Sequence, residues 1–210
     1  MFSEEHYTNM DFSNQVIEEM ELSRKKFTHC RFIGADFSDV SICYHCEFDN
    51  CNFSSAILSS VHFKNCIFLN CRFRFANLFA VNFDGCKMIG SSLMDTDCSL
   101  VSITDGDWSY TEMRFLEFDK QMIERVNFTG SDFTGTSFIR CILSECNFTD
   151  IITHNLSFRH SDIRTSHLGL DQNSLLSIED VYKRQGVWLD TAQFHKFDTS
   201  PVQAGYHFVI

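Results

Sequence analysis

Cysteine and histidine are the residues in this sequence that first suggest chemistry. The chain has ten Cys and nine His, and Cys43, His45, Cys46 and Cys51 lie close together, as scattered metal ligands can. The other His residues are dispersed, and no Ser-His-Asp or Cys-His arrangement or phosphate-binding Gly loop can be assembled. We therefore predict no zinc site, no catalytic residues and no cofactor, and we interpret the chain as a binding protein rather than an enzyme.

Carboxylates form a second group, concentrated near the middle of the chain. Between residues 95 and 119 there are seven acids and one base, Arg114, which gives a net charge of −6. The acids are Asp95, Asp97, Asp105, Asp107, Glu112, Glu117 and Asp119. Such a run is either ordinary solvated surface or a site that attracts a basic partner. The choice depends on how the backbone distributes these side chains.

A repeat of five residues organises the chain. Every fifth position from Phe48 to Leu168 is apolar in 24 of 25 cases, although only 44% of the chain is hydrophobic. Small residues recur two positions earlier, as in Cys-Asn-Phe-Ser-Ser at 51–55 and Ser-Asp-Phe-Thr-Gly at 131–135. A period of five fits neither a helix nor a flat strand, so the chain must turn a corner at each unit.

Upstream, the same step runs one residue out of phase, through Phe12, Phe27, Phe37 and Ile42. One residue is therefore inserted before Phe48. We predict a bulge or small loop in residues 41–45, with Cys43 and Tyr44 as the outliers, and a register break at 43–47.

The repeat resembles the pentapeptide-repeat family, A-(D/N)-(L/F)-x-x, over roughly residues 10–170. The resemblance implies an all-β, right-handed quadrilateral β-helix with four units per coil and about eight coils, roughly 35–40 Å long. The central residue and the small residue two before it point inward, and the other three face water. Residues 1–9 are then an N-terminal cap, and residues 171–210 a tail outside the repeat.

Register also gives the cysteines a structural interpretation. Eight of them occupy the small inward position and Cys98 a central one, so we expect buried reduced thiols that pack as small hydrophobes. Cys46 and Cys66 fall on one face one coil apart, a spacing that also permits disulfides. Cys46 and Cys51 should point inward while Cys43 and His45 do not, which argues against a shared metal.

Within the family, the chain is similar to the quinolone-resistance (Qnr), mycobacterial fluoroquinolone-resistance and microcin-immunity proteins, which bind type II topoisomerases. The single break in the repeat is closer to the loop-free microcin-immunity type than to Qnr proteins with projecting loops. The resemblance implies a DNA mimic that binds DNA gyrase or topoisomerase IV and protects it from quinolones or peptide toxins, with the seven acids as a belt. Our alternative is a generic scaffold or effector that makes protein contacts.

Charge and hydropathy limit the partners. The formal net charge of −11 disfavours direct contact with nucleic acid, because phosphates require a surplus of Lys and Arg. No long apolar run and no signal peptide is evident, so we expect a cytoplasmic protein without membrane contact.

The C-terminal tail raises two further expectations. Residues 170–178 could begin the short helix through which relatives dimerise, which suggests a homodimer through the C-terminal end. Residues 180–185 read Asp-Val-Tyr-Lys-Arg-Gln, which resembles the translated end of a transposon used to build sequencing libraries. We interpret residues from about 179 to 210 as partly or wholly read-through or chimeric; the alternative is an ordinary irregular tail.

Overall fold

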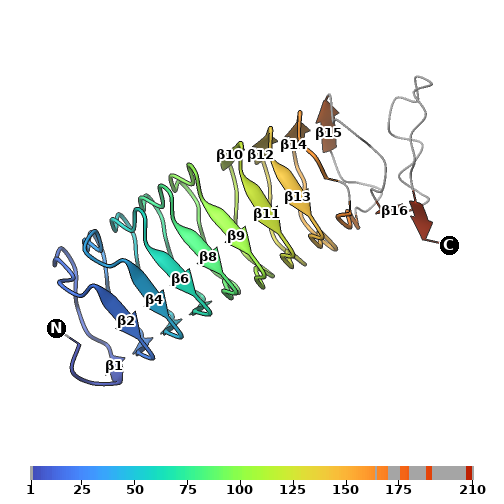
Figure 1. Cartoon of the computed structure of the whole chain (residues 1–210). Helices are drawn as coiled ribbons and strands as arrows, with labels where there is room; N and C mark the ends of the chain where they lie inside the picture. The colour runs from blue at the N-terminus through green and yellow to red at the C-terminus, as the bar shows by residue number, and fades with distance from the viewer. Residues whose placement is uncertain (1, 164, 170–175, 180–187, 191–206, 210) are drawn as a thin grey trace.

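The computed structural model describes residues 2–163, 165–169, 176–179, 188–190 and 207–209. This part of the chain winds into a straight, right-handed β-solenoid of about eight turns (Figure 1). All of its regular elements are short strands, and no helix occurs in the described ranges. The predicted fold class is therefore confirmed.

The rod has four faces, which we number 1 to 4 in chain order. Face 1 carries β1 (His6–Thr8), β3 (Lys26–Thr28), β5 (Glu47–Asp49) and β7 (Ile67–Leu69). Face 2, centred on residues such as Phe53 and Phe73, is joined by isolated bridges such as Asn52 to Arg72. Face 3 carries β10 (Glu117–Asp119), β12 (Ser137–Ile139), β14 (Leu156–Arg159) and β15 (Leu176–Glu179).

Face 4 is the longest sheet and lies toward the viewer in Figure 1. Its strands are β2 (Glu21–Ser23), β4 (Ile42–Tyr44), β6 (His62–Lys64), β8 (Asn82–Asp84), β9 (Ser102–Thr104), β11 (Met122–Glu124) and β13 (Ile142–Ser144). Two further strands, β16 (Trp188–Asp190) and β17 (His207–Val209), pair with each other in parallel.

Central side chains fill the interior because strands one turn apart pair in register. Phe63 lies opposite Phe83, and Phe83 opposite Ile103. Every central residue from Phe48 to Leu168 is at most 4% exposed. The rings of Phe53 and Phe73 stack with centroids 5.0 Å apart, close to the spacing between adjacent strands. Each buried Phe contributes about 1.5–3 kcal/mol of hydrophobic stabilisation.

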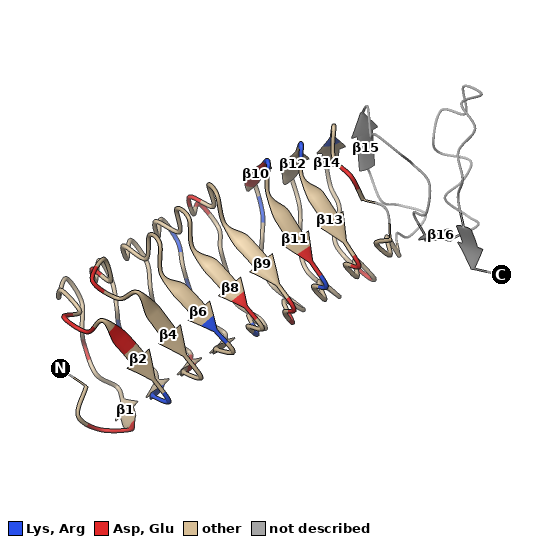
Figure 2. Ribbon diagram, viewed as in Figure 1, with Lys and Arg blue, Asp and Glu red and all other residues tan. Residues whose placement is uncertain are grey.

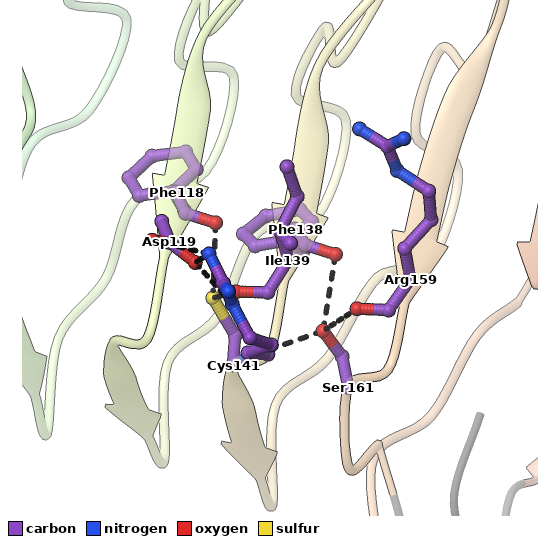
Figure 3. Close-up of polar contacts among 8 residues, drawn as sticks. Phe118, Asp119, Phe138, Ile139, Cys141, Arg159 and Ser161 are labelled. Carbon is purple, nitrogen blue, oxygen red and sulfur yellow. Dashed lines mark hydrogen bonds and ion pairs between the residues drawn. The ribbon is translucent and has the colours of Figure 1, made fainter. Parts of the chain in front are cut away.

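The small inward position often carries a side chain that can donate a hydrogen bond. Cys141 Sγ donates to the carbonyl of Phe118 at 3.2 Å, and Ser161 Oγ donates to the carbonyl of Phe138 at 3.0 Å (Figure 3). Each of these carbonyls belongs to a central residue of the preceding turn. Cys, Ser and Thr at this position are therefore both small enough to fit and able to donate to a buried acceptor.

The polar positions of the repeat are explained by local backbone bonds. The Asn52 and Asp132 side chains each accept the amide N–H two residues later at 2.9 Å, which closes an Asx turn at the start of the corner. Corner residues then adopt positive φ, for example 51° at Asn65 and 70° at Gly135. Asn and Gly tolerate this conformation best.

The position of the register break corrects the sequence-based prediction. The extra residue is Ser41, because the amides of Ser41 and Ile42 both approach the carbonyl of Met20, at 3.0 and 3.5 Å. Cys43, predicted to be an outlier, is the buried central residue of β4 and pairs with Leu22 and Phe63. The break at 43–47 is therefore wrong, and so is the central place given to Ile42, which is only partly buried.

The C-terminal end of the repeat also differs from expectation. β15 pairs with β14 in parallel, with Phe158 opposite Ile178, so the 20-residue register continues past residue 170. Residues 176–178 are therefore strand rather than the expected helix. Residues 170–175 and 180–187, which include the Asp-Val-Tyr-Lys-Arg-Gln segment, lie outside the described residues.

All ten cysteines are buried. Burial was predicted for the nine at inward positions of the repeat, whereas Cys43 was predicted to face outward and is buried as well. Burial raises the pKa of Cys98 to about 12 and the pKa values of Cys141 and Cys146 to about 11. A thiol with a pKa near 11 is roughly one-thousandth thiolate at pH 8. We expect Ellman's reagent at pH 8 to react about 100-fold more slowly with these thiols in the native chain than in urea. Rapid titration of the thiols in the native chain would contradict this.

Candidate interaction surface

The seven acids predicted to form a belt lie at outward positions on three faces and two edges of the rod. Asp97, Glu117 and Asp119 project from face 3, Asp107 from face 1 and Glu112 from face 2, while Asp95 and Asp105 occupy corners. Acidic and basic residues are interspersed along the rod in Figure 2. Wrapping of the chain therefore spreads the acids around the rod, but it also brings bases from neighbouring turns beside them.

Two corner acids are paired with arginines from adjacent turns. Arg74 Nε lies 3.0 Å from Asp95 Oδ2. Arg125 binds Asp105 through both oxygens, at 2.5 and 2.9 Å, and these hydrogen bonds hold the pKa of Asp105 below its ordinary value. Neither carboxylate therefore presents an isolated charge to the solvent.

Two further acids are also paired with arginines, one from an adjacent turn and one from the same turn. Asp119 accepts hydrogen bonds of 2.6–2.8 Å from Arg140, one turn away (Figure 3). Glu112 accepts Ser92 Oγ at 2.7 Å and pairs with Arg114. Burial raises the pKa of Glu112, but these hydrogen bonds outweigh burial and the pKa is lowered overall. Each of the four paired acids is therefore matched by a guanidinium.

The remaining three acids form no ion pair within the described residues. Asp107 accepts hydrogen bonds from the Ser109 amide at 3.2 Å and from Asn127 Nδ2 at 3.1 Å. Asp97 accepts the Ser99 amide at 2.9 Å, and Glu117 is exposed on β10. The seven acids and their four arginine partners together have a net charge of −3. The net charge of residues 95–119 counted along the sequence is −6.

Comparison with known proteins supports the repeat assignment. Residues 46–85, 56–95 and 123–150 match the family model of pentapeptide repeats, in eight copies. The chain carries repeats of the pentapeptide-repeat family. No curated protein sequence matches this pentapeptide-repeat protein.

Solved structures show the same fold as this pentapeptide-repeat protein. A trypsin-treated variant of QnrB1, a plasmid-mediated fluoroquinolone resistance protein, is 22% identical with a TM-score of 0.73, covering 82% of this chain and 89% of that chain. Full-length QnrB1 is also 22% identical with a TM-score of 0.69, covering 91% and 96%. At this identity the likeness concerns the fold alone.

Sequence reasoning missed two features of the pentapeptide-repeat surface. The arginine partners of Asp95, Asp105 and Asp119 lie 20 or 21 residues away, outside any local window. The 20-residue coil length was the signal that could have found them. The second feature is a set of exposed phenylalanines, Phe75, Phe79 and Phe115, at positions where the repeat faces water.

Other sites considered in the sequence can now be placed. Cys43, Cys46 and Cys51 are buried in the interior while His45 is an exposed corner residue, and the described ranges contain no group of three or more metal-ligating residues. No helix capable of crossing a membrane occurs among the described residues. The helix expected to mediate dimerisation falls partly on residues 170–175, which lie outside the described part.

Proposed function

We propose that this pentapeptide-repeat protein is a cytoplasmic DNA mimic that binds DNA gyrase or topoisomerase IV and protects it from quinolones or peptide toxins. The observation that carries the proposal is the belt of carboxylates on the outside of a narrow rod whose interior is filled with apolar side chains. Duplex DNA presents one negative charge per about 1.7 Å of its axis. A rod of this kind can occupy a basic groove shaped for DNA without any nucleic acid present.

The likeness to QnrB1 supports the same proposal. QnrB1 is a fluoroquinolone resistance protein, and its fold matches this chain over most of both lengths. A packed solenoid core leaves only exterior side chains available for binding, so a role in protein contact is more compatible with the structure than catalysis.

A supercoiling assay with gyrase or topoisomerase IV and a ciprofloxacin titration tests the proposal. We expect the purified chain to relieve drug inhibition or to inhibit supercoiling directly. If it does neither at concentrations up to tens of micromolar, the proposed function is wrong.

The charge mechanism makes a sharper prediction. Replacing Arg74 and Arg140 with Gln uncovers Asp95 and Asp119, so association with the enzyme should become faster, about tenfold at low salt, because steering depends on the exposed charge. Lys26→Gln with Arg31→Gln is the matched control, since it uncovers Glu47 and Asp11 far from the belt. Equal acceleration by both pairs would show that net charge, not the belt, governs binding.

A protein-binding scaffold without topoisomerase activity is the second candidate. It is favoured by the exposed aromatic side chains Phe75 and Phe115, which charge mimicry does not need. Stable binding partners that include no topoisomerase would support this candidate over the first.

A further inference from the structure

Exposed phenylalanines gather around one face of the rod. Within residues 2–163 all other Phe side chains are buried, whereas Phe75, Phe79 and Phe115 are 58%, 43% and 69% exposed. Phe79 projects from face 3, and Phe75 and Phe115 occupy the edge where face 2 meets face 3. Leu100, 59% exposed, lies on the opposite edge of face 3. Exposed apolar side chains that cluster in this way mark interaction surfaces more often than singly scattered ones do.

The two edge phenylalanines are spaced along the rod axis. Phe75, Asp95 and Phe115 occupy the same corner in three consecutive turns, so the two rings are separated by two inter-strand steps, roughly 10 Å. A Cβ built on Gly135 would lie 2.5 Å from the ring of Phe115, which shows that this ring rests against the next corner. The Arg74 guanidinium, paired with Asp95, lies 4.7 Å from the ring of Phe75. Both rings are thus held by neighbours while most of their surface stays in water.

Face 3 also carries the two belt acids that are exposed and have no ion pair within the described residues. Asp97 and Glu117 occupy equivalent positions of the repeat on consecutive turns. The ladder of face 3 is interrupted between them, because Asp97 bridges Asn77 of the preceding turn and β10 begins the next sheet. One oxygen of Asp97 caps the Ser99 amide, which leaves the other oxygen for a donor on a partner. Two adjacent carboxylates beside an apolar ridge complement a partner that alternates basic and apolar side chains.

The spacings match an α-helix laid along the rod. A helix rises 1.5 Å per residue, so side chains at i and i+7 are about 10.5 Å apart and those at i and i+4 about 6 Å apart. The first spacing matches Phe75 and Phe115, and Lys residues on the flank of the same helix would face Asp97 and Glu117. We propose that face 3 near mid-rod, through Phe75, Phe79, Leu100, Phe115, Asp97 and Glu117, docks a basic amphipathic helix of a protein partner. This surface goes beyond the proposed function because it holds for any partner with such a helix.

Fluorescence anisotropy with a synthetic helix tests the docking surface. The probe is a labelled Leu/Lys peptide of about 18 residues. Its Leu residues are seven positions apart on one helical face, and its Lys residues are four positions apart beside them. A control peptide has Glu in place of every Lys. We expect the wild-type chain to bind the basic peptide at least about tenfold more tightly than the acidic control peptide. Phe75→Ser with Phe115→Ser should weaken binding by about tenfold or more.

Charge and control variants separate this surface from non-specific attraction. Asp97→Asn with Glu117→Gln should weaken binding and flatten its salt dependence, and the Asp97→Asn substitution retains a side-chain acceptor for the Ser99 amide.

Two control pairs test whether the effect is specific to face 3. Met122→Ser with Ile142→Ser removes apolar side chains of 50% and 48% exposure from face 4 instead. Glu21→Gln with Glu145→Gln removes two other exposed acids. Both control pairs should leave the dissociation constant within about twofold.

Several outcomes would overturn the proposal. Equal loss of binding in the face 3 and face 4 variants would show that the peptide binds without a site. A wild-type dimer in light scattering that Phe75→Ser with Phe115→Ser converts to monomer would make face 3 a contact between copies of this chain. Circular dichroism of each variant checks that the solenoid is intact. An inactive supercoiling assay alongside specific peptide binding would reject the topoisomerase while leaving the docking surface in place.

Discussion

Phe83→Ala should destabilise the solenoid by about 3–5 kcal/mol, a large part of the 5–15 kcal/mol that typically separates folded from unfolded domains. Phe83 is fully buried at the centre of β8 and stacks on Phe63 with centroids 5.3 Å apart. It also meets the Trp108 ring edge-on at 5.2 Å. Truncation leaves a cavity between turns that rigid strand pairing cannot close. Urea unfolding followed by circular dichroism measures the loss.

Phe75→Ala is the matched control, because it makes the same substitution at a site that is 58% exposed. The repeat places the two residues only eight positions apart, one inside and one outside the tube. We expect Phe75→Ala to change the free energy of unfolding by no more than about 0.5 kcal/mol. Equal losses in the two variants would mean that the interior is not packed as described.

Gly106→Ala should destabilise the middle of the rod by about 1–3 kcal/mol. Gly106 holds the small inward position beneath the largest core side chain, Trp108. A Cβ there would lie 2.8 Å from Trp108 Nε1 and 2.9 Å from the Cys86 carbonyl oxygen. The carbonyl belongs to the backbone of the preceding turn, so it cannot move aside without disturbing strand pairing. Thermal unfolding of Gly106→Ala beside wild type measures the effect.

Trp108→Phe provides the control for that prediction. The smaller ring removes the contact at Nε1, an atom that is buried without a hydrogen-bond partner among the described residues. Gly106→Ala should therefore cost less in the Trp108→Phe background, with a coupling of about 1 kcal/mol or more. Strict additivity of the two substitutions would show that the Cβ and the indole do not compete for the same space.

The register break illustrates where sequence reasoning lost accuracy. The change of phase between Phe37 and Phe48 is visible in the sequence, but Ile42 and Cys43 are both apolar and either can fill the central position. Strand pairing of Cys43 with Leu22 and Phe63 decides between them. The energy difference comes from alignment with neighbouring turns, which a local pattern does not contain.

The belt illustrates a second limit. A window of 25 residues found the acids and one base, whereas Arg74, Arg125 and Arg140 enter from adjacent turns. The sequence did contain these residues at the coil spacing of about 20, but their contact depends on side-chain reach across a corner. The exposure of Phe75 and Phe115 was likewise missed, because every other Phe within residues 2–163 except Phe79 is a core residue.

The amino-acid sequence by itself determined the all-β solenoid, its coil length and which side chain of each unit is buried. The period of five shows that the chain turns a corner at each unit, and the resemblance to the pentapeptide-repeat family implies the strands, the inward positions and the coil of four units. Only the tertiary structure decided which residue was inserted, which acids are neutralised and which face keeps unpaired charge beside exposed aromatic rings. Those properties depend on contacts between residues a full turn apart, and such contacts exist only once the chain has wound.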